Sequence, residues 1–278
     1  MWNAGFVPEQ TSDPSEAFLL MKMDGAAVLN WGRMDPRGVT TGTRAVLGDH
    51  LRAIREPVSI VPNTTVGQAT YVDWAARSAF SDPTVVEAIH IDGCRMYGDA
   101  YPDFVFLLCA IQAPVGGESF IIDGWRLLAE IAADPGLRDL LRFLWRVPIE
   151  HSTGDAVPSR CPIVRETIGG RVSLRRHNYQ RLVDDAPPNP EHQEFLDQWS
   201  KLTNQAVDTA PRFRLEPGDL FCLDNYRVFH GREPFSGQRL LHGIWSWSDM
   251  AFAVPDVEAT ERKATEKARV AAQASLHR

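Results

Sequence analysis

His90 and Asp92, in the tripeptide His90-Ile91-Asp92, are the residues of this chain best suited to bind a metal ion, together with His230 about 140 residues later. Two imidazoles and one carboxylate on one face of an ion form the facial triad of non-haem Fe(II) oxygenases. That triad leaves adjacent coordination positions open for a co-substrate and dioxygen. The three residues therefore predict an oxidative enzyme.

A second His-x-acid tripeptide, His192-Gln193-Glu194, is unsuited to this task. It follows Asn189-Pro190, a cap and first-turn pair that opens a predicted helix. Side chains two apart on a helix diverge by roughly 200°, so they cannot chelate one ion. The segment from Val85 to His90 is instead β-prone, and residues two apart on a strand share a face. His90 and Asp92 can therefore bind the same ion.

The composition is that of a globular enzyme that acts on small molecules. The 278 residues are 44% hydrophobic, enough for a substantial core. A net charge of −7 argues against nucleic acid or an anionic membrane as the partner. No signal-like segment and no run of roughly 20 apolar residues is present, which predicts a cytoplasmic protein. Homo-oligomerisation stays open.

The cysteines form no Cys-x-x-Cys pair and stand at Cys94, Cys109, Cys161 and Cys222. Cys109 and Cys222 lie inside apolar runs. We therefore expect reduced thiols rather than a disulfide framework or a structural zinc site.

The element pattern predicts a mainly β fold with helical inserts. Helices are expected at 14–23, 43–54, 125–143 with a break near Asp134-Pro135-Gly136, and 190–208. Strands are expected at 26–30, 104–111, 119–122, 163–167 hairpinned with 172–177, 213–215, 220–223 and 239–247. Many short strands favour a sandwich or barrel. We expect one catalytic domain over residues 1–254 and a charged tail, helical or disordered and without a catalytic role, over 255–278.

Several motifs in order resemble the TauD/TfdA superfamily of Fe(II)/2-oxoglutarate dioxygenases. They are His90-Ile-Asp92, Pro102-Asp-Phe-Val-Phe-Leu-Leu-Cys109, Gly116-Gly-Glu-Ser-Phe-Ile-Ile-Asp-Gly124, Pro217-Gly-Asp219 and Asp224-Asn-Tyr-Arg-Val-Phe-His-Gly-Arg232 with Gly237-Gln-Arg239. The match covers roughly residues 85–250. It is most similar to the γ-butyrobetaine and trimethyllysine hydroxylase branch, for the catalytic domain only. The resemblance implies a distorted double-stranded β-helix, a cupin-like jelly roll.

The resemblance also implies co-substrate residues. Arg239 matches the arginine that binds the distal carboxylate of 2-oxoglutarate, Ser119 a hydroxyl that shares this carboxylate, and Leu107 a contact to its methylenes. Guanidinium binds carboxylates bidentately. Fe(II), one aspartate and dianionic 2-oxoglutarate together leave one negative charge, which one buried arginine neutralises. An ordinary strand-entry serine is the alternative for Ser119, and Leu107 could equally be a plain core residue.

Asp92 favours hydroxylation over halogenation, because the halogenases replace this carboxylate with a small residue. The expected cofactors are Fe(II), 2-oxoglutarate as co-substrate and O₂, and the products are succinate, CO₂ and an oxidised unactivated C–H bond. Asp224 and Asn225 are candidates to support the metal ligands, with a tight-turn role as the alternative.

The substrate residues follow from less specific features. Trp245 matches an aromatic-cage position for a quaternary ammonium group, and Tyr71 and Trp74 could contribute. Arg175, Arg176, Asn178 and Arg181 crowd one strand and its exit, where carboxylate contacts occur in the family; a solvated basic face is the alternative. We expect a small carboxylate-bearing substrate, amino acid-like or a secondary-metabolite intermediate. The alternatives are a γ-butyrobetaine- or trimethyllysine-type substrate, or a cupin-like metalloenzyme that does not use 2-oxoglutarate.

The turn from Gly93 to Tyr101 directly follows Asp92 and carries two glycines. Its position predicts a movable lid over the open coordination sites. We therefore expect Arg95 and Tyr97 to contact substrate.

Overall fold

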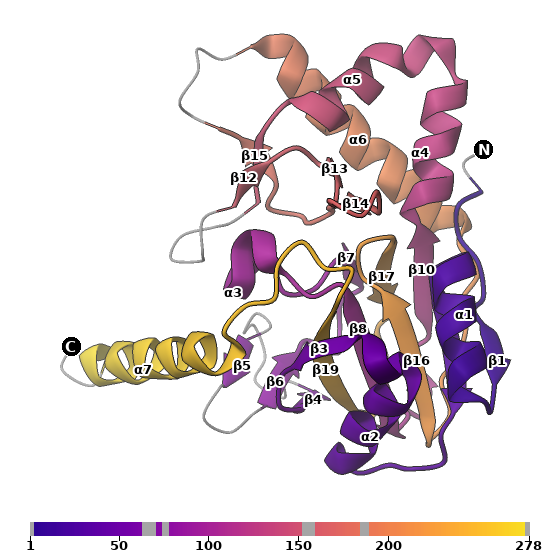
Figure 1. The fold of residues 1–278 in the computed structure, drawn as a ribbon, viewed down its shortest axis with the longest axis vertical. Helices are drawn as coiled ribbons and strands as arrows, with labels where there is room; N and C mark the ends of the chain where they lie inside the picture. The colour runs from indigo at the N-terminus through magenta and orange to yellow at the C-terminus, as the bar shows by residue number, and fades with distance from the viewer. Residues whose placement is uncertain (1–2, 63–70, 74–77, 152–158, 184–188, 276–278) are drawn as a thin grey trace.

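The computed structural model of the chain describes residues 3–62, 71–73, 78–151, 159–183 and 189–275, with the backbone alone at 71–73, 78–81 and 267–275. Its largest sheet has the spatial order β1-β2-β16-β8-β19-β4-β6-β5, and β3 also pairs with β19 (Figure 1). The strands are β1 (Glu9–Thr11), β2 (Ala26–Asn30), β3 (Leu51–Ile54), β4 (Val58–Pro62), β5 (Tyr71–Asp73), β6 (Ser78–Ser81), β8 (Phe104–Ile111), β16 (Asp219–Asp224) and β19 (Leu240–Ser248).

A smaller antiparallel sheet has the order β10-β17-β7. Its strands are β10 (Ser119–Asp123), β17 (Val228–Arg232) and β7 (Glu87–His90). The remaining strands form short pairings: β11 (Ile149–Glu150) with β12 (Arg160–Cys161) and β15 (Arg181–Leu182), β13 (Val164–Glu166) with β14 (Val172–Leu174), and β9 (Val115–Gly116) with β18 (Phe235–Ser236).

Alternation along β8 divides the core into two layers. Phe104, Phe106 and Leu108 pack against the helices α1 (Pro14–Asp24) and α2 (Pro36–Leu47) on the outer face of the large sheet. Val105 and Cys109 point the other way and pack with residues of the small sheet such as Ile121 and Val228. Successive side chains of a strand alternate between faces, so one apolar run serves both layers.

The other face of the small sheet is covered by helices α4 (Gly124–Ala133), α5 (Arg138–Arg146) and α6 (Pro190–Thr209) (Figure 1). The shorter helical segments are α3 (Cys94–Tyr97) and the 3-10 turns Gly48–His50, Gly98–Ala100 and Pro135–Leu137. Helix α7 (Val257–Ser275) projects from the body. The tail is thus helical over these residues.

Most of the expected elements are confirmed, with the boundaries set by their caps. The Asp13 side chain accepts a hydrogen bond from Ser15 N–H at the start of α1, and Gly25, with φ of 94°, ends the helix. The Asn189 side chain caps α6 in the same way. The expected break between α4 and α5 lies at Pro135–Leu137.

Three expected elements are wrong. The helix expected at 43–54 begins instead at Pro36, where Asp35 caps it, and ends at Leu47, while Leu51–Ile54 pairs with β19. In the last four residues of the expected helix, pairing with β19 thus outweighs the helical spacing of the apolar residues. The strand expected at 213–215 is a single bridge between Phe213 and Ser119. The hairpin arm expected to reach His177 ends at Leu174.

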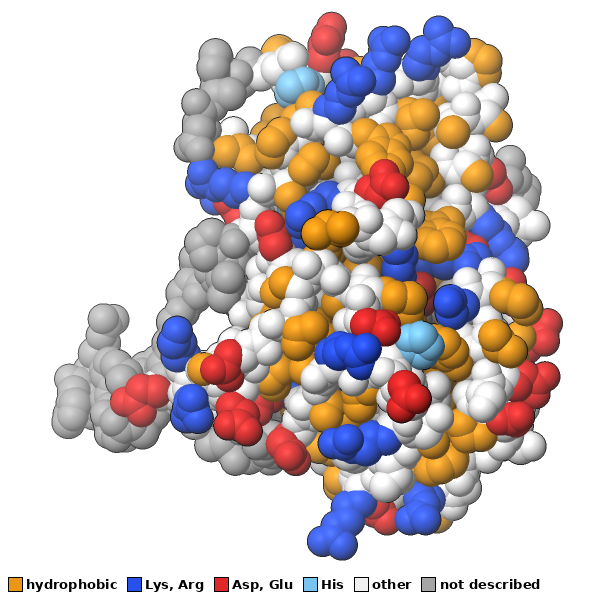
Figure 2. Space-filling model, in the orientation of Figure 1, with side chains coloured by type: hydrophobic (Ala, Val, Ile, Leu, Met, Phe, Trp, Pro, Cys, Tyr) orange, Lys and Arg blue, Asp and Glu red, His pale blue; other side chains and the backbone are white. Residues whose placement is uncertain are grey.

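Among the described residues, no helix combines the length and the apolar composition needed to cross a bilayer. On the face shown in Figure 2, acidic and basic side chains are interspersed with hydrophobic ones. The described cysteines Cys94, Cys109, Cys161 and Cys222 are all buried free thiols.

Candidate functional site

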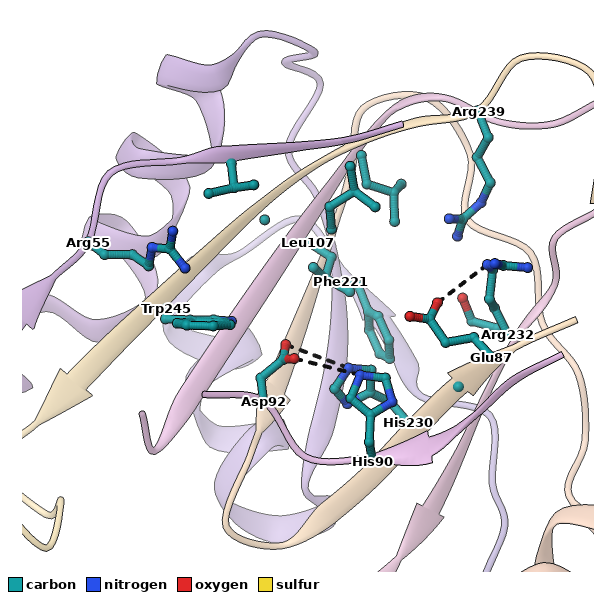
Figure 3. Close-up of a pocket in the computed structure, with 16 residues that line it drawn as sticks. Arg55, Glu87, His90, Asp92, Leu107, Phe221, His230, Arg232, Arg239 and Trp245 are labelled. Carbon is teal, nitrogen blue, oxygen red and sulfur yellow. Dashed lines mark ion pairs between the residues drawn. The ribbon is translucent and has the colours of Figure 1, made fainter. Parts of the chain in front are cut away.

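The two sheets close around a cavity of about 240 Å³, below the roughly 300–1,000 Å³ typical of sites for drug-sized ligands. Strands β7, β10 and β17 line one side, and β4, β8, β16 and β19 line the other (Figure 3). The cavity therefore suits a small metabolite held between the sheets.

His90 and His230 lie opposite each other in this cavity, because they are directly paired on the antiparallel strands β7 and β17. Their ring centroids are 4.4 Å apart. The carboxylate of Asp92 lies 3.6 Å from His90 Nε2 and 3.7 Å from His230 Nε2. The three candidate ligand atoms fall within 4.8 Å of one another. The fold thus brings together all three residues of the predicted triad.

Hydrogen bonds fix the orientation of the triad. His90 Nδ1 donates to the Ala88 carbonyl at 2.9 Å, which leaves Nε2 to bind a metal. Asn225 is buried, accepts from the Asp92 N–H at 2.9 Å and donates to the Asp92 carbonyl at 3.1 Å. Asp224 is turned away and pairs with Arg171 at 2.6 Å. Of the two candidate supporting residues, only Asn225 contacts the segment that carries a ligand.

Gly93 lets the chain turn immediately after Asp92. It has φ of 86°, and a Cβ there would lie 2.2 Å from Cδ of Pro102. Only glycine combines that backbone conformation with so close an approach.

The triad is strongly coupled electrostatically. Burial lowers the pKa of His90, but the hydrogen bond and the charge of Asp92 outweigh burial and raise it to about 9. Burial opposes ionisation of Asp92, yet the two histidines hold the pKa of its carboxyl well below the usual range. Burial and the nearby His90 lower the pKa of His230 to about 4. A partly buried carboxylate between two imidazoles is a donor set that suits a divalent cation.

Arg239 lies at the opposite end of the cavity, just before β19, and is only 5% exposed. Within the part of the chain that the structure describes, its guanidinium forms no hydrogen bond or ion pair. Burial and the positive charge of Arg232 lower its pKa to about 10, so it is still charged at neutral pH. A buried cation without a counter-ion favours an anionic ligand.

Arg232 points into the same region but is already engaged. Its Nε lies 3.3 Å from a carboxylate oxygen of Glu87, and its Nη atoms donate to the carbonyls of Asp82, Val85 and Glu233. Of these two arginines, Arg239 is therefore the one whose charge is available to a ligand.

Ser119 and Leu107 line the cavity together with Arg239. Ser119 begins β10 and pairs across the sheet with Arg232, and Leu107 projects from β8 (Figure 3). The structure thus brings together all three residues predicted to contact the co-substrate.

Of the predicted substrate residues whose side chains the structure describes, only Trp245 lines the cavity. Tyr97 packs edge-on against Trp245, with centroids 6.0 Å apart, and against Trp247 at 4.8 Å. Arg95 and Asn178 are exposed, and Arg181 pairs with Glu150 across β15 and β11. These last three residues are not among those that line the cavity.

Arg175 and Arg176 are buried, so they form no solvated basic face, and neither is among the residues that line the cavity. Arg175 pairs with Asp99 at 3.1 Å, and Arg176 donates to Thr203 at 2.9 Å. Arg175 therefore links its segment to the 3-10 turn Gly98–Ala100, and Arg176 links it to α6. Trp74 and the side chain of Tyr71 lie outside the described residues.

The segment expected to be a movable turn is packed instead. It forms α3 and the 3-10 turn Gly98–Ala100, and its residues Cys94, Tyr97 and Tyr101 are buried. The Ala100 carbonyl accepts a hydrogen bond from Trp247 Nε1 at 2.7 Å. Burial of its aromatic side chains holds this segment against the sheet.

Arg55 is a cavity residue that sequence reasoning missed. It follows β3, is 4% exposed, and its guanidinium carbon lies 4.4 Å from the ring centroid of Trp245. Its Nε lies 3.0 Å from a carboxylate oxygen of Glu261 on α7. The tail, which was expected to have no catalytic role, therefore contacts a residue of the cavity wall.

Comparison with known proteins gives a consistent result. The family described as "Taurine catabolism dioxygenase TauD, TfdA family" matches residues 49–245. The chain is 29% identical over 157 residues to γ-butyrobetaine dioxygenase of Pseudomonas sp. (strain AK-1), covering 52% of this chain and 39% of that protein. It is 23% identical to mitochondrial trimethyllysine dioxygenase of Bos taurus, and the match covers 72% of this chain and 49% of that protein. The chain thus spans half or less of the length of these two relatives.

Solved structures share the fold. A taurine dioxygenase from Burkholderia xenovorans superposes with a TM-score of 0.60 at 15% identity, covering 86% of this chain and 83% of that chain. An asparagine oxygenase in complex with Fe(II), 2S,3S-3-hydroxyasparagine and succinate superposes with a TM-score of 0.56 at 18% identity, covering 84% and 77%. The predicted double-stranded β-helix is confirmed.

Proposed function

This chain belongs to the TauD/TfdA family, and we propose that it is an Fe(II)/2-oxoglutarate-dependent dioxygenase. It would hydroxylate an unactivated C–H bond of a small carboxylate-bearing substrate. One observation carries the proposal: a His-Asp-His cluster, with His230 buried and His90 and Asp92 partly buried, faces the same small cavity as a buried arginine that has no counter-ion among the described residues. The first feature suits a divalent metal and the second an organic anion.

The metal would be held on one face by Nε2 of His90, Nε2 of His230 and the carboxylate of Asp92. When bound, iron supplies the activation of dioxygen, with one oxygen atom entering succinate and the other the hydroxylated product. Ala88 and Asn225 would keep the ligands oriented through their hydrogen bonds to His90 and Asp92.

Arg239 and Ser119 would bind the distal carboxylate of 2-oxoglutarate, and Leu107 would pack against its methylene groups. The formal charges support this arrangement. Divalent iron, Asp92, dianionic 2-oxoglutarate and Arg239 sum to zero, and the Arg232–Glu87 pair adds no net charge. The co-substrate would therefore enter without leaving an uncompensated charge in a buried site.

We also propose the domain organisation, the location and the partners of the enzyme. Residues 1–254 would form one catalytic domain and 255–278 its appended tail. We propose a cytoplasmic enzyme that acts on small molecules, without nucleic acid or membrane partners, in line with its net charge of −7.

A γ-butyrobetaine- or trimethyllysine-type activity is the second candidate. It is favoured by the similarity to dioxygenases with those names. Coupled succinate formation in the presence of γ-butyrobetaine or trimethyllysine would support it.

The proposed function is tested by measuring succinate formation and oxygen uptake in the purified protein with Fe(II) and 2-oxoglutarate. Slow, uncoupled succinate formation that requires both additions is expected even without substrate. Oxygen uptake that does not depend on 2-oxoglutarate would favour a cupin-like metalloenzyme of another kind.

A further inference from the structure

The cavity has a second cationic end that the proposed chemistry does not use. Arg55 and Trp245 lie on one side of the triad, and Arg239 and Arg232 lie on the other (Figure 3). Arg55 is buried, and its charge interacts with that of Asp92. A group bound at Arg55 would thus lie next to the metal ligands, opposite the co-substrate end.

The stacking of Arg55 on Trp245 determines which charge this end accepts. The guanidinium carbon lies 4.4 Å from the ring centroid, so a face of the indole is already occupied by a cation. A quaternary ammonium group placed there would have to displace the arginine or lie beside a like charge in a buried site. The Trp245 site therefore disfavours cations.

Glu261 supplies the counter-ion of Arg55 from outside the catalytic core. Its carboxylate lies 3.0 Å from Arg55 Nε, and its side chain is 16% exposed, on a helix that projects from the body. A glutamate in this position can exchange its partner for water, whereas the buried Arg55 cannot.

We propose that Arg55 binds a carboxylate of the substrate and that Glu261 occupies this position until substrate displaces it. The proposal rests on the proposed function and names its substrate class as anionic at this end. With 2-oxoglutarate bound and Glu261 on Arg55, the formal charges of the metal, the co-substrate and the charged side chains described here sum to zero. An added carboxylate is compensated only if Glu261 moves into solvent, so substrate entry and release of α7 are linked.

The anaerobic Fe(II)–2-oxoglutarate complex provides the test, with its metal-to-ligand charge-transfer band as the reporter. Two probes of similar length and opposite charge, pentanoate and butyltrimethylammonium, are titrated into the complex. Pentanoate should perturb the band at lower concentration than the cation. Arg55→Met should weaken pentanoate binding by about tenfold or more while the band itself persists, because a buried carboxylate loses its partner.

Arg52→Met is the matched control, because Arg52 lies on β3, the strand that Arg55 follows, but is exposed and pairs with Asp249. Its pentanoate affinity should stay within about twofold of wild type. Arg55→Lys keeps the charge and should bind pentanoate better than Arg55→Met does. Together these variants distinguish the effect of losing the positive charge at position 55 from the effect of misfolding.

Glu261→Gln tests the exchange itself. Removing the competing carboxylate should tighten pentanoate binding by about threefold or more. Pentanoate should also speed amide hydrogen exchange in α7 of the wild-type protein. Weaker binding by Glu261→Gln, or unchanged exchange in α7, would refute the displacement.

Tighter binding of the cation, or an Arg55→Met protein that binds pentanoate like wild type, would overturn the assignment of Arg55 while the proposed function stood. Absence of the charge-transfer band in the wild-type protein would instead refute the proposed function, and this inference with it.

Discussion

His90 and His230 face each other as a directly paired couple on neighbouring antiparallel strands, with ring centroids 4.4 Å apart. Although about 140 residues separate them in the chain, the register of β7 and β17 fixes their distance. Asp92, two residues past His90, completes the set from the end of the same segment. Strand pairing therefore positions the two histidines, while Asp92 lies two residues past the end of β7 and is held by Asn225.

Replacing either histidine should abolish metal binding. His90→Ala or His230→Ala removes one of three protein ligands, so bound iron, measured by elemental analysis after desalting, should fall to background. His192→Ala is the control, since His192 belongs to the other His-x-acid tripeptide and lies on α6. Wild-type iron content in either triad variant would show that the ligands lie elsewhere.

Arg239→Ala should raise the KM for 2-oxoglutarate strongly while iron stays bound. The variant strips a buried carboxylate of its partner, which costs roughly 3–5 kcal/mol. Steady-state kinetics of succinate formation measure the effect. An unchanged KM would move the anchor to Arg232.

Asn225→Ala should weaken iron binding by about tenfold to a hundredfold without removing a ligand. Asn225 is a positioning residue, because it holds both the N–H and the carbonyl of Asp92. Competition with a chelator measures the loss. Wild-type affinity would mean that β7 and Gly93 suffice to orient Asp92.

Tyr97 should support coupling through Trp245 rather than through its hydroxyl. Its oxygen is buried and forms no hydrogen bond to the described residues, while its ring packs against Trp245. Tyr97→Ala should therefore lower the ratio of product to succinate once a substrate is known, and Tyr97→Phe should not. Arg95→Ala should behave like wild type, because Arg95 is exposed and does not line the cavity. Equal defects in Tyr97→Phe and Tyr97→Ala would assign the role to the hydroxyl.

Acid should destabilise the fold through His151. Burial and the charge of Arg175 lower the pKa of His151 to about 3, below its unfolded value of about 6.5. As pH falls below 6.5 the unfolded state takes up the proton first, so stability decreases from pH 6.5 towards pH 3. Between pH 6.5 and 5 this group should cost about 1.5–2 kcal/mol.

Denaturant unfolding at the two pH values measures this loss. His151→Gln should reduce the pH dependence. Equal pH dependence of His151→Gln and wild type would assign the acid sensitivity to other groups.

The triad and the co-substrate residues could be predicted because they sit in compact motifs with a fixed order along the chain. Arg55 could not. It follows a segment whose apolar spacing indicated a helix, and its partners Trp245 and Glu261 lie about 190 and 206 positions away. The pairing of β3 and β4 with β19, on either side of Arg55, brings it to the cavity.

Burial explains the other errors. The two glycines of the segment from Gly93 to Tyr101 predict a movable turn, yet Cys94, Tyr97 and Tyr101 are buried against the core. Arg175 likewise forms an ion pair with Asp99, which lies far from it in the sequence. No local sequence pattern indicates that contact. Local spacing predicts which elements form, while long-range contacts decide which side chains reach the site.

The central claim is that the His-Asp-His cluster and Arg239 form one Fe(II)–2-oxoglutarate site. Its most direct test is anaerobic titration of the Fe(II) protein with 2-oxoglutarate, followed by the metal-to-ligand charge-transfer band. We predict a saturable band in the wild-type protein, no band in His230→Ala, and a band at much higher 2-oxoglutarate concentration in Arg239→Ala. A wild-type protein that binds Fe(II) but develops no band would contradict the account.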